Sequence, residues 1–291
     1  MSNLIKKNKY DLIVIGGGPS GMMMAGRAAE SGASVLLLEK NKELGKKLKI
    51  TGGGRCNITN AEFDTNLFLD NFPKAKKFLY SPFSKFSSKD TFIFFESRKL
   101  PLVTEARKRV FPKSQSALDV HNTMEKFIKK NGVEIRTGTR VASINKKNKK
   151  IISITTAKRE EIFGDNFAIA TGGLAAPKTG STGEGFSMLR KLGHKVSPAN
   201  PNIVPLITDS KWIHRLSGLS LSFMEIRFMI GTKTYIKKRG KILFTHFGIS
   251  GPLILNSALE VRGLFKIGKV TASIDMFPDT EENELNRRIL R

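Results

Sequence analysis

The sequence of 291 residues contains a single cysteine, Cys56, which excludes an intrachain disulfide and a zinc site built from cysteines. Its four histidines lack the spacing of a metal-binding motif, so we expect no metal. No apolar run approaches the roughly 18 residues that a membrane-spanning helix needs, and we expect no membrane partner. Since disulfides are absent, the cytoplasm is the expected compartment.

Acidic residues are scarce relative to basic ones. There are 50 lysines and arginines against 25 aspartates and glutamates, which gives a formal net charge of +25. Such a field attracts phosphates, acidic cofactors or nucleic acid. Much of the excess lies in short clusters such as residues 146–150 (KKNKK), which are typical of solvated loop tips. The charge alone therefore identifies no partner.

Residues 11–38 predict a strand, a helix and a second strand. The run 11–15 is apolar and ends in glycines, residues 21–31 are rich in Met and Ala, and residues 34–38 are again apolar. Short apolar strands that flank a helix of small residues are typical of the βαβ unit of a parallel sheet. The pattern indicates an α/β fold.

The turn after the first strand has the pattern G-x-G-x-x-G. Its glycines permit a tight turn, a close approach of the backbone to a pyrophosphate, and close helix packing. Glu39 ends the second strand, where a carboxylate can accept a hydrogen bond from a ribose hydroxyl. The pattern predicts an adenine dinucleotide with a free 2′-hydroxyl, as in FAD or NAD. The predicted contacts at the turn are Gly16, Gly18, Pro19, Ser20 and Gly21.

A second glycine-rich loop spans residues 51–57 (TGGGRCN). Consecutive glycines let backbone amides curve around a ligand, and the nearby cations can offset anionic charge; a flexible linker is the alternative. The cysteine is either a redox-active thiol or a small packed residue. The predicted cofactor contacts here are Lys47, Gly53, Gly54, Arg55, Cys56 and Asn57.

The rest of the chain predicts two further regions. Residues 133–144, 151–157 and 162–171 indicate a small meander of strands that leads into one more buried strand. Three prolines in residues 197–205 mark a domain crossing, and alternating segments beyond it predict an antiparallel sheet. We therefore expect two domains, residues 1–198 and 199–291. Asp279 and Glu282 predict the start of a last helix, inside which the chain stops.

Several motifs together resemble one family. They are GGGPSG, GKKLKITGGGRCNITN, KRVFPKSQSALDV, ATGGLAAPKTGSTGEGF and FTHFGISGP, in this order between residues 11 and 257. The series resembles the bacterial YhiN/BaiN-type flavoproteins, which are described as NAD(P)/FAD-dependent oxidoreductases, some of them labelled aminoacetone oxidases.

The resemblance implies a Rossmann-like FAD-binding domain of the two-dinucleotide-binding-domain type, with an inserted, mostly β second domain. It implies non-covalent FAD, with the ribose at Glu39 and the adenine against the strand that carries Val141, and Lys40 is a further predicted cofactor contact. The second glycine turn would be Ala170, Thr171 and Gly172. NAD(P)H is the candidate electron donor. No catalytic residue is implied, and His246 is either a proton donor or a structural histidine.

Members of this family continue beyond the point at which this chain stops, with a glycine-rich segment that closes around the flavin. We therefore expect the fold to be truncated at its C-terminus and the second domain to be incomplete. On this basis the 291-residue chain should hold FAD weakly.

The resulting functional prediction is an FAD-binding oxidoreductase that acts on an unidentified small molecule. Two alternatives stay open, an RNA-associated flavoprotein of the tRNA-modifying type and a non-catalytic truncated remnant. The charge of +25 favours the RNA reading. Against it, the sequence shows no recognisable RNA-binding module and no basic stripe with interleaved aromatic residues. Nucleic acid is therefore not the expected partner, and the sequence does not indicate the oligomeric state.

Overall fold

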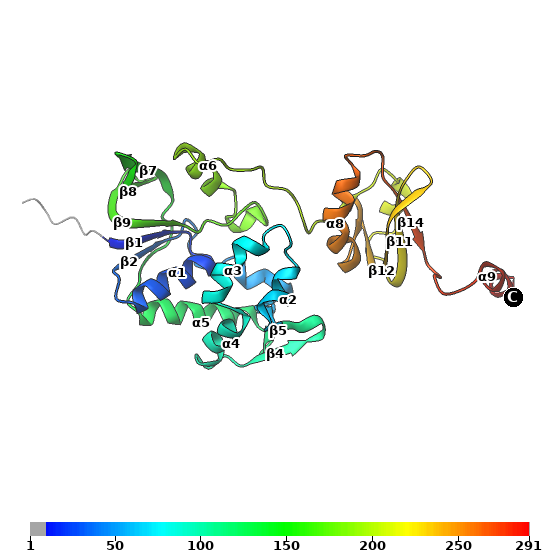
Figure 1. Cartoon of the computed structure of the whole chain (residues 1–291), viewed down its shortest axis with the longest axis horizontal. Coiled ribbons are helices and arrows are strands. Elements are labelled where there is room, and N and C mark those ends of the chain that lie inside the picture. The colour runs from blue at the N-terminus through cyan, green and yellow to red at the C-terminus, as the bar shows by residue number, and fades with distance from the viewer. Residues whose placement is uncertain (1–9, 291) are drawn as a thin grey trace, which may run out of the picture. The chain divides into compact units, whose positions relative to one another are not determined.

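The computed structural model describes residues 10–290, except the side chain of Glu282. The chain divides after Ser197 into two compact units (Figure 1). Unit 1 is the part before this division and unit 2 is the part after it, and each is described by itself.

The main sheet of unit 1 has the strand order β6-β2-β1-β9-β8-β7. Strand β1 (Tyr10–Ile15) pairs in parallel with β2 (Val35–Leu38) on one side and with β9 (Glu161–Ile169) on the other. Strand β6 (Glu134–Arg136) extends the parallel part beyond β2. Strands β8 (Lys150–Thr156) and β7 (Val141–Lys147) continue it in antiparallel fashion beyond β9. This is the α/β, Rossmann-like sheet that the sequence predicts.

Strand β2 is buried on both faces. All four residues of β2 are buried, which explains why its sequence is continuously apolar. Helices α1 (Pro19–Glu30) and α5 (Ala117–Lys130) cover one face of the sheet (Figure 1). A Cβ at Gly26 of α1 would lie 2.2 Å from the ring of Phe127 in α5, so glycine sets how closely the two helices pack.

The predicted strand over residues 133–144 is wrong, because two strands occupy this run. β6 ends at Arg136 and pairs in parallel with β2, whereas β7 begins at Val141 and pairs with β8 at the other edge of the sheet. The other two predicted strands correspond to β8 and β9, although the last residues of β9 are only half-buried. Pairing with β2 is a long-range contact that the local apolar pattern does not encode.

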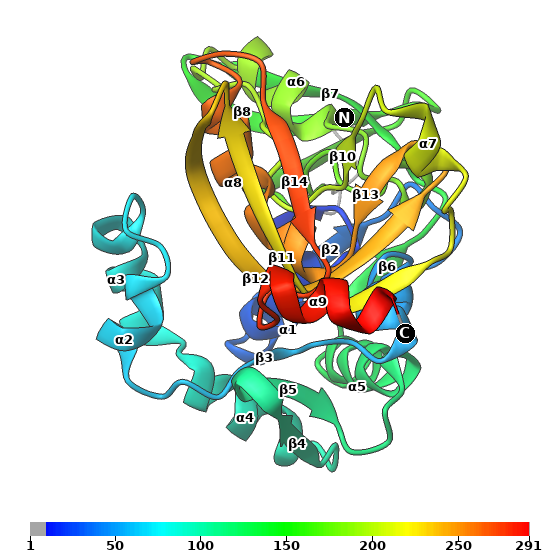
Figure 2. The same cartoon turned by 90° about the vertical axis from the view of Figure 1, so that its right-hand side faces the viewer.

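A smaller layer in unit 1 carries a helical arm. Its sheet consists of β3 (Thr59–Asn60), β5 (Arg109–Pro112) and β4 (Leu102–Glu105), in that order. The helices of this region are α2 (Thr65–Asp70), α3 (Lys76–Lys85) and α4 (Ser88–Glu96). Helices α2 and α3 pack on each other through rings such as Phe68 and Phe83, whose centroids lie 4.8 Å apart. Figure 2 shows them standing away from this layer.

The remaining short elements of unit 1 are α6 (Glu184–Lys191) and three 3-10 helices, at Leu48–Gly54, Ala106–Lys108 and Pro177–Thr179. None of the helices within residues 10–290 has the length and apolar character needed to cross a membrane.

Unit 2 is a five-stranded antiparallel sheet with the order β10-β13-β12-β11-β14, as the alternating sequence predicts. Its core packs Ile226, Phe228 and Ile242 from the sheet against Ile254 and Val261 of α8. The strands are β10 (Leu206–Ile207), β11 (Ser220–Ile230), β12 (Lys233–Thr245), β13 (Gly248–Ser250) and β14 (Thr271–Asp275), and the helices are α7 (Lys211–His214), α8 (Pro252–Leu264) and α9 (Glu282–Ile289).

The expected start of the last helix at Asp279 is wrong. α9 begins at Glu282, and Glu281 occupies the N-cap position without a side-chain cap. The Asp279 carboxylate instead accepts a hydrogen bond of 2.6 Å from the Arg239 guanidinium. An ion pair with β12 thus replaces the predicted local cap.

A buried carboxylate links the strands of unit 2. The side chain of Glu225 on β11 is 1% exposed and contacts Arg227 at 2.8 Å, Lys237 at 3.0 Å and Arg239 at 3.1 Å. Hydrogen bonds from Arg227 and Lys237 lower the pKa of Glu225 to about 2. Because three cations surround one carboxylate, protonation of Glu225 would leave their charges poorly compensated.

We expect the stability of unit 2 to depend on pH through Glu225. The folded pKa of about 2 is below the ordinary value of 4.5. The stabilisation is therefore fully present above about pH 4.5 and is lost as the pH falls towards 2. The only tryptophan, Trp212, lies in α7 of unit 2, so its fluorescence can follow the unfolding midpoint between pH 6 and pH 2.5.

Glu225→Gln should lower this midpoint at pH 6 and flatten its decline with acid. The control is Glu260→Gln, which removes an exposed partner of Lys238 in the same unit and should keep the wild-type pH profile. An equally steep acid decline in the wild type and in Glu225→Gln would contradict this role.

Candidate functional site

A cavity of about 170 Å³ opens where the parallel strands of unit 1 end. Its walls come from the residues that follow β1, β2 and β9 and from the start of β7 and α6. In open α/β sheets, ligands bind in the crevice outside the carboxyl ends of the strands. The volume is below the 300–1,000 Å³ typical of small-molecule pockets, so the enclosed part suits one portion of a larger ligand.

Many predicted cofactor contacts line this cavity. They are Gly16, Gly18, Pro19, Glu39, Lys40, Lys47, Val141, Ala170, Thr171 and Gly172. Ser20 and Gly21 lie in the first turn of α1 but do not line it. These segments are far apart in the sequence, and the sheet order β2-β1-β9-β8-β7 brings them together.

Glycine occurs at the positions of the first turn for different physical reasons. Gly16 has a φ of +113°, and a Cβ there would lie 2.5 Å from the Ala170 carbonyl oxygen. A Cβ at Gly21 would lie 1.9 Å from the Gly16 carbonyl oxygen. Both positions therefore require glycine for the fold itself.

Gly18 is the exception, because the protein does not require glycine there. Its φ of −75° suits any residue, and a Cβ would meet no protein atom within 4 Å. Since Gly18 lines the cavity at the N-cap of α1, a side chain would occupy space beside the free amides of the helix N-terminus. The open space at this position fits a phosphate-bearing ligand.

Glu39 points towards the glycine turn, as the sequence predicts. Its Oε2 accepts a hydrogen bond of 2.7 Å from the amide of Gly17, and its Oε1 accepts bonds of 2.8 Å and 2.7 Å from the backbone and side chain of Asn41. An ionised carboxylate offers about four acceptor sites. These three donors leave room for one more, such as a ribose hydroxyl.

Lys47 supplies positive charge to the wall that contains Gly172 and Ser181. Its Nζ donates to the Ser181 hydroxyl at 2.8 Å and lies 3.7 Å from where a Cβ of Gly172 would be. Among the side chains that the structure describes, it forms no ion pair with a carboxylate. The cation is therefore available for an anionic ligand between the two glycine turns.

The second glycine loop does not line the cavity. Gly53, Gly54, Arg55, Cys56 and Asn57 all lie outside its lining. The Arg55 guanidinium donates to Glu105 at 2.6 Å and lies 4.0 Å from the ring centre of Phe111, so its charge is already compensated. This ion pair lowers the pKa of Glu105. Oriented to donate, the Asn57 amide reaches the carbonyl oxygens of Thr59 and Val110 at 3.0 Å and 3.2 Å.

The chemical roles of Cys56 and His246 could not be decided from the sequence, and these two residues lie in different units. Cys56 is buried with a φ of +59°, and burial raises the pKa of its thiol. This environment disfavours a thiolate and matches the packed-residue alternative. His246 lies in the turn between β12 and β13 of unit 2, where its ring meets that of Phe247 edge-on at 4.8 Å.

The sequence analysis missed several polar residues of the cavity. Asn41, Ser181 and Glu184 line it and contact predicted residues, whereas Arg140 lines it and pairs with Glu184. The serine and glutamate lie in the GSTGEG stretch after β9, whose glycines were a usable signal. Their partners are more than 40 residues away in the chain, so spacing alone could not assign them.

The comparisons with known proteins agree with this architecture. A family model described as HI0933-like protein Rossmann domain matches residues 10–275. A 3-dehydro-bile acid delta(4,6)-reductase from Clostridium scindens is 30% identical over 94% of this chain and 66% of the relative. A ribosomal RNA dihydrouridine synthase from Escherichia coli is 27% identical over 96% of this chain and 67% of the relative. The chain thus spans about two thirds of the length of these curated relatives.

A solved structure has a similar fold. A 3-ketosteroid-delta4-(5alpha)-dehydrogenase from Rhodococcus jostii aligns with a TM-score of 0.51 and 13% sequence identity. The alignment covers 80% of this chain and 62% of that chain. At this level of identity the similarity concerns the fold.

The different space around Gly18 and Gly21 can be measured through the free energy of unfolding of variants at these positions. Gly21→Ala should lower the free energy of unfolding by about 1–3 kcal/mol, because its Cβ has no room. Gly18→Asn should change it by no more than about 0.5 kcal/mol, because the side chain enters open space and asparagine is a good N-cap. Urea unfolding followed by circular dichroism compares the two. Equal losses would show that Gly18 is also a packing requirement.

Proposed function

This chain belongs to the HI0933-like family of Rossmann-domain proteins, and we propose that it binds FAD and acts as an oxidoreductase. The observation that supports this most strongly is the glycine turn after β1, where Gly18 borders the cavity and Glu39 contacts Gly17 at 2.7 Å. A backbone turn without side-chain bulk, next to a carboxylate, suits the diphosphate and ribose of an adenine dinucleotide.

Each wall of the cavity has a proposed role. The amides at the start of α1 face the diphosphate, and the free acceptor site of Glu39 takes a ribose hydroxyl. Lys47 neutralises part of the diphosphate charge. Val141 lies at the start of β7 and gives the adenine an apolar contact. When bound, FAD supplies the hydride-transfer chemistry, and the protein binds and orients it.

The names of the relatives suggest a substrate class. One is a delta(4,6)-reductase and the other forms dihydrouridine, so both names denote saturation of carbon–carbon double bonds. We extend this to the present chain as reduction of a double bond in a small unsaturated carbonyl compound. The double bond gains a hydride on one carbon and a proton on the other. NAD(P)H is the expected donor and leaves as NAD(P)⁺, which balances the electrons.

FAD binding is tested by titrating the purified protein with FAD and recording its visible spectrum. Gly18→Asp places a carboxylate beside the diphosphate, whereas Gly18→Asn places an uncharged side chain of the same shape there. We expect the aspartate variant to bind FAD at least about tenfold more weakly than the asparagine variant, because like charges repel. Circular dichroism should show both variants folded, since both residues are good N-caps.

Wild-type protein that fails to bind FAD at any concentration would overturn the proposed function. Anaerobic addition of NADH and of NADPH to the FAD-loaded protein then identifies the donor, because flavin absorbance near 450 nm bleaches on reduction.

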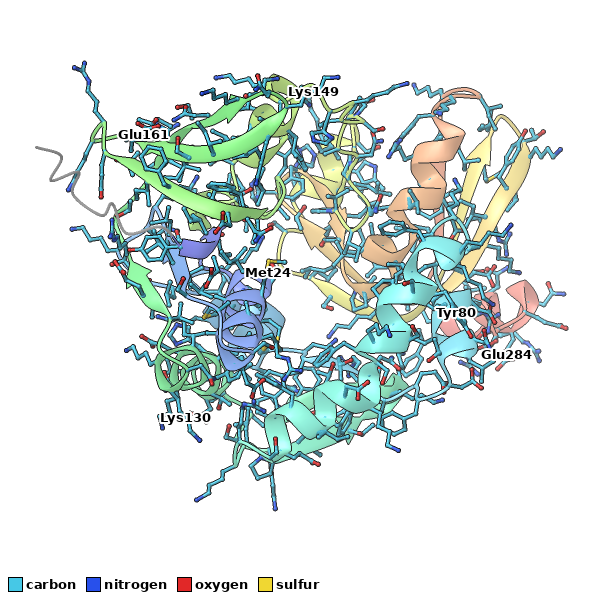
Figure 3. The ribbon with its side chains drawn as sticks, turned by 60° about the vertical axis from the view of Figure 1, so that its left-hand side comes forward. Met24, Tyr80, Lys130, Lys149, Glu161 and Glu284 are labelled. Atoms are coloured by element: carbon cyan, nitrogen blue, oxygen red, sulfur yellow. The ribbon has the colours of Figure 1, made fainter. Side chains whose placement is uncertain are left out.

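A second candidate substrate is RNA, and one structural feature favours it. Lysines and aromatic residues are interspersed, without strict alternation, in residues 74–89 (KAKKFLYSPFSKFSSK), a stretch that bears on the expectation that no such stripe exists. No side chain of helix α3 is fully buried, and Phe78 and Tyr80 are 80% and 52% exposed. Figure 3 marks Tyr80 on this helix. Exposed aromatic rings among cations are typical of surfaces on which unpaired bases stack.

Binding of a single-stranded oligouridylate, followed by fluorescence anisotropy at 50 and 200 mM salt, tests this candidate. Phe78→Ala with Tyr80→Ala should weaken binding at both salt concentrations by at least about tenfold, because stacking contributes about 1–3 kcal/mol per base. The matched control replaces two exposed apolar residues of unit 2, Phe265 and Ile267, by alanine. Binding that disappears at 200 mM salt and ignores both double variants would reflect net charge alone and would remove RNA as a candidate.

A further inference from the structure

Two cations share one carboxylate at the wall of the cavity. Lys40 follows Glu39 at the end of β2, Arg140 precedes β7, and Glu184 is the first residue of α6. The Lys40 Nζ lies 3.1 Å from one oxygen of Glu184, and the Arg140 guanidinium lies 3.1 Å from the other. Three separate elements therefore meet in this ion-pair cluster.

The cluster lies on the same side of the cavity as Glu39. All four side chains line the cavity, and the Thr139 amide, one residue before Arg140, donates to the Glu39 carbonyl oxygen at 2.8 Å. In adenine dinucleotide sites, an acid at the end of the second strand binds the ribose 2′-hydroxyl, whereas an arginine nearby accommodates a 2′-phosphate. This cavity contains both kinds of group.

We propose that Glu184 determines the nucleotide specificity of the cavity. By pairing with Lys40 and Arg140, it withholds both cations from a 2′-phosphate, so that the cavity selects adenosine with a free 2′-hydroxyl. This inference rests on the proposed function, because it requires the cavity to take adenosine. A 2′-phosphate beside Glu39 would face two carboxylates and find the neighbouring cations already paired.

Two other lysines, Lys46 and Lys47, also line the cavity. Lys47 is directed towards Ser181 and the Gly172 turn, on the side proposed for the diphosphate. The competing explanation for the cluster is purely structural, since Lys40 also donates to the Thr182 hydroxyl at 3.0 Å and so helps to fix the start of α6. The two explanations predict different effects on ligand selectivity.

The test uses two ligands that differ only in the 2′-phosphate, adenosine 5′-monophosphate and adenosine 2′,5′-bisphosphate. Calorimetric titration of the full chain should show tighter binding of the monophosphate to the wild type. In Glu184→Gln, the ratio of the two affinities should shift towards the bisphosphate by about tenfold, which corresponds to ~1.4 kcal/mol. Combining Glu184→Gln with Lys40→Met should reverse part of this shift, because one of the released cations is then gone.

Glu160→Gln is the matched control. Glu160 pairs with Arg136 at 2.9 Å in the same unit but does not line the cavity, so this variant removes an equal charge elsewhere. It should keep the wild-type affinity ratio. The same shift in Glu160→Gln would assign the effect to overall charge and would overturn the proposal.

The other outcomes are also decisive. An unchanged affinity ratio in Glu184→Gln, together with a lower melting temperature, would establish the structural explanation and refute the specificity role. Failure of the wild type to bind either nucleotide would refute this inference, and its failure to bind FAD as well would also refute the proposed function. Binding of the monophosphate with no change in selectivity would refute only the inference. If Glu184→Gln does not fold, the double variant with Lys40→Met leaves fewer uncompensated charges and should show a smaller shift in the same direction, and an unchanged ratio in it would refute the inference.

Discussion

The attachment of the glycine turn to the end of β2 is the constraint on which the cavity depends. Gly16 donates to the Leu38 carbonyl oxygen at 2.8 Å, and Gly17 donates to the Glu39 carboxylate at 2.7 Å. The Gly45 amide in turn donates to the Gly17 carbonyl oxygen at 2.9 Å. A Cβ at Gly17 would lie 2.4 Å from a methyl carbon of Leu44, so no side chain fits inside this junction. Contacts within the protein therefore hold the turn in place without a ligand.

Glu39 therefore has a structural role in addition to its proposed role in binding. One of its oxygens fixes the glycine turn, and the other fixes Asn41, whose side chain also reaches the Thr179 carbonyl oxygen at 3.1 Å. The same carboxylate thus connects the ends of β1 and β2 with the segment that leads to α6. A ligand that uses the remaining acceptor site of Glu39 would contact a group that the fold already holds rigid, which reduces the entropic cost of binding.

The sequence predicted what depends on local spacing. The strand, glycine turn and helix of residues 10–30 follow from a short apolar run, small helical residues and fixed glycine positions, and the structure has them. The division of residues 133–144 between β6 and β7 could not be predicted, because β6 is defined by pairing with β2, about a hundred residues earlier. Similarly, Arg140 and Glu184 are 44 positions apart in the chain and became part of the site only through the ion pair that joins them in the fold.

The loop of residues 51–57 shows why composition does not locate a ligand. Gly52, Gly53 and Gly54 have φ values of +57°, +68° and +85°, so glycine is needed there for the backbone conformation alone. Its charged residue is paired with Glu105, and its thiol is buried with a raised pKa. What this loop can still offer a ligand is its backbone. The cavity adds glycines, paired charges and Lys47, which pairs with no carboxylate among the described residues. The protein is therefore left to bind and orient the cofactor, and the redox chemistry of the proposed reaction lies on the cofactor.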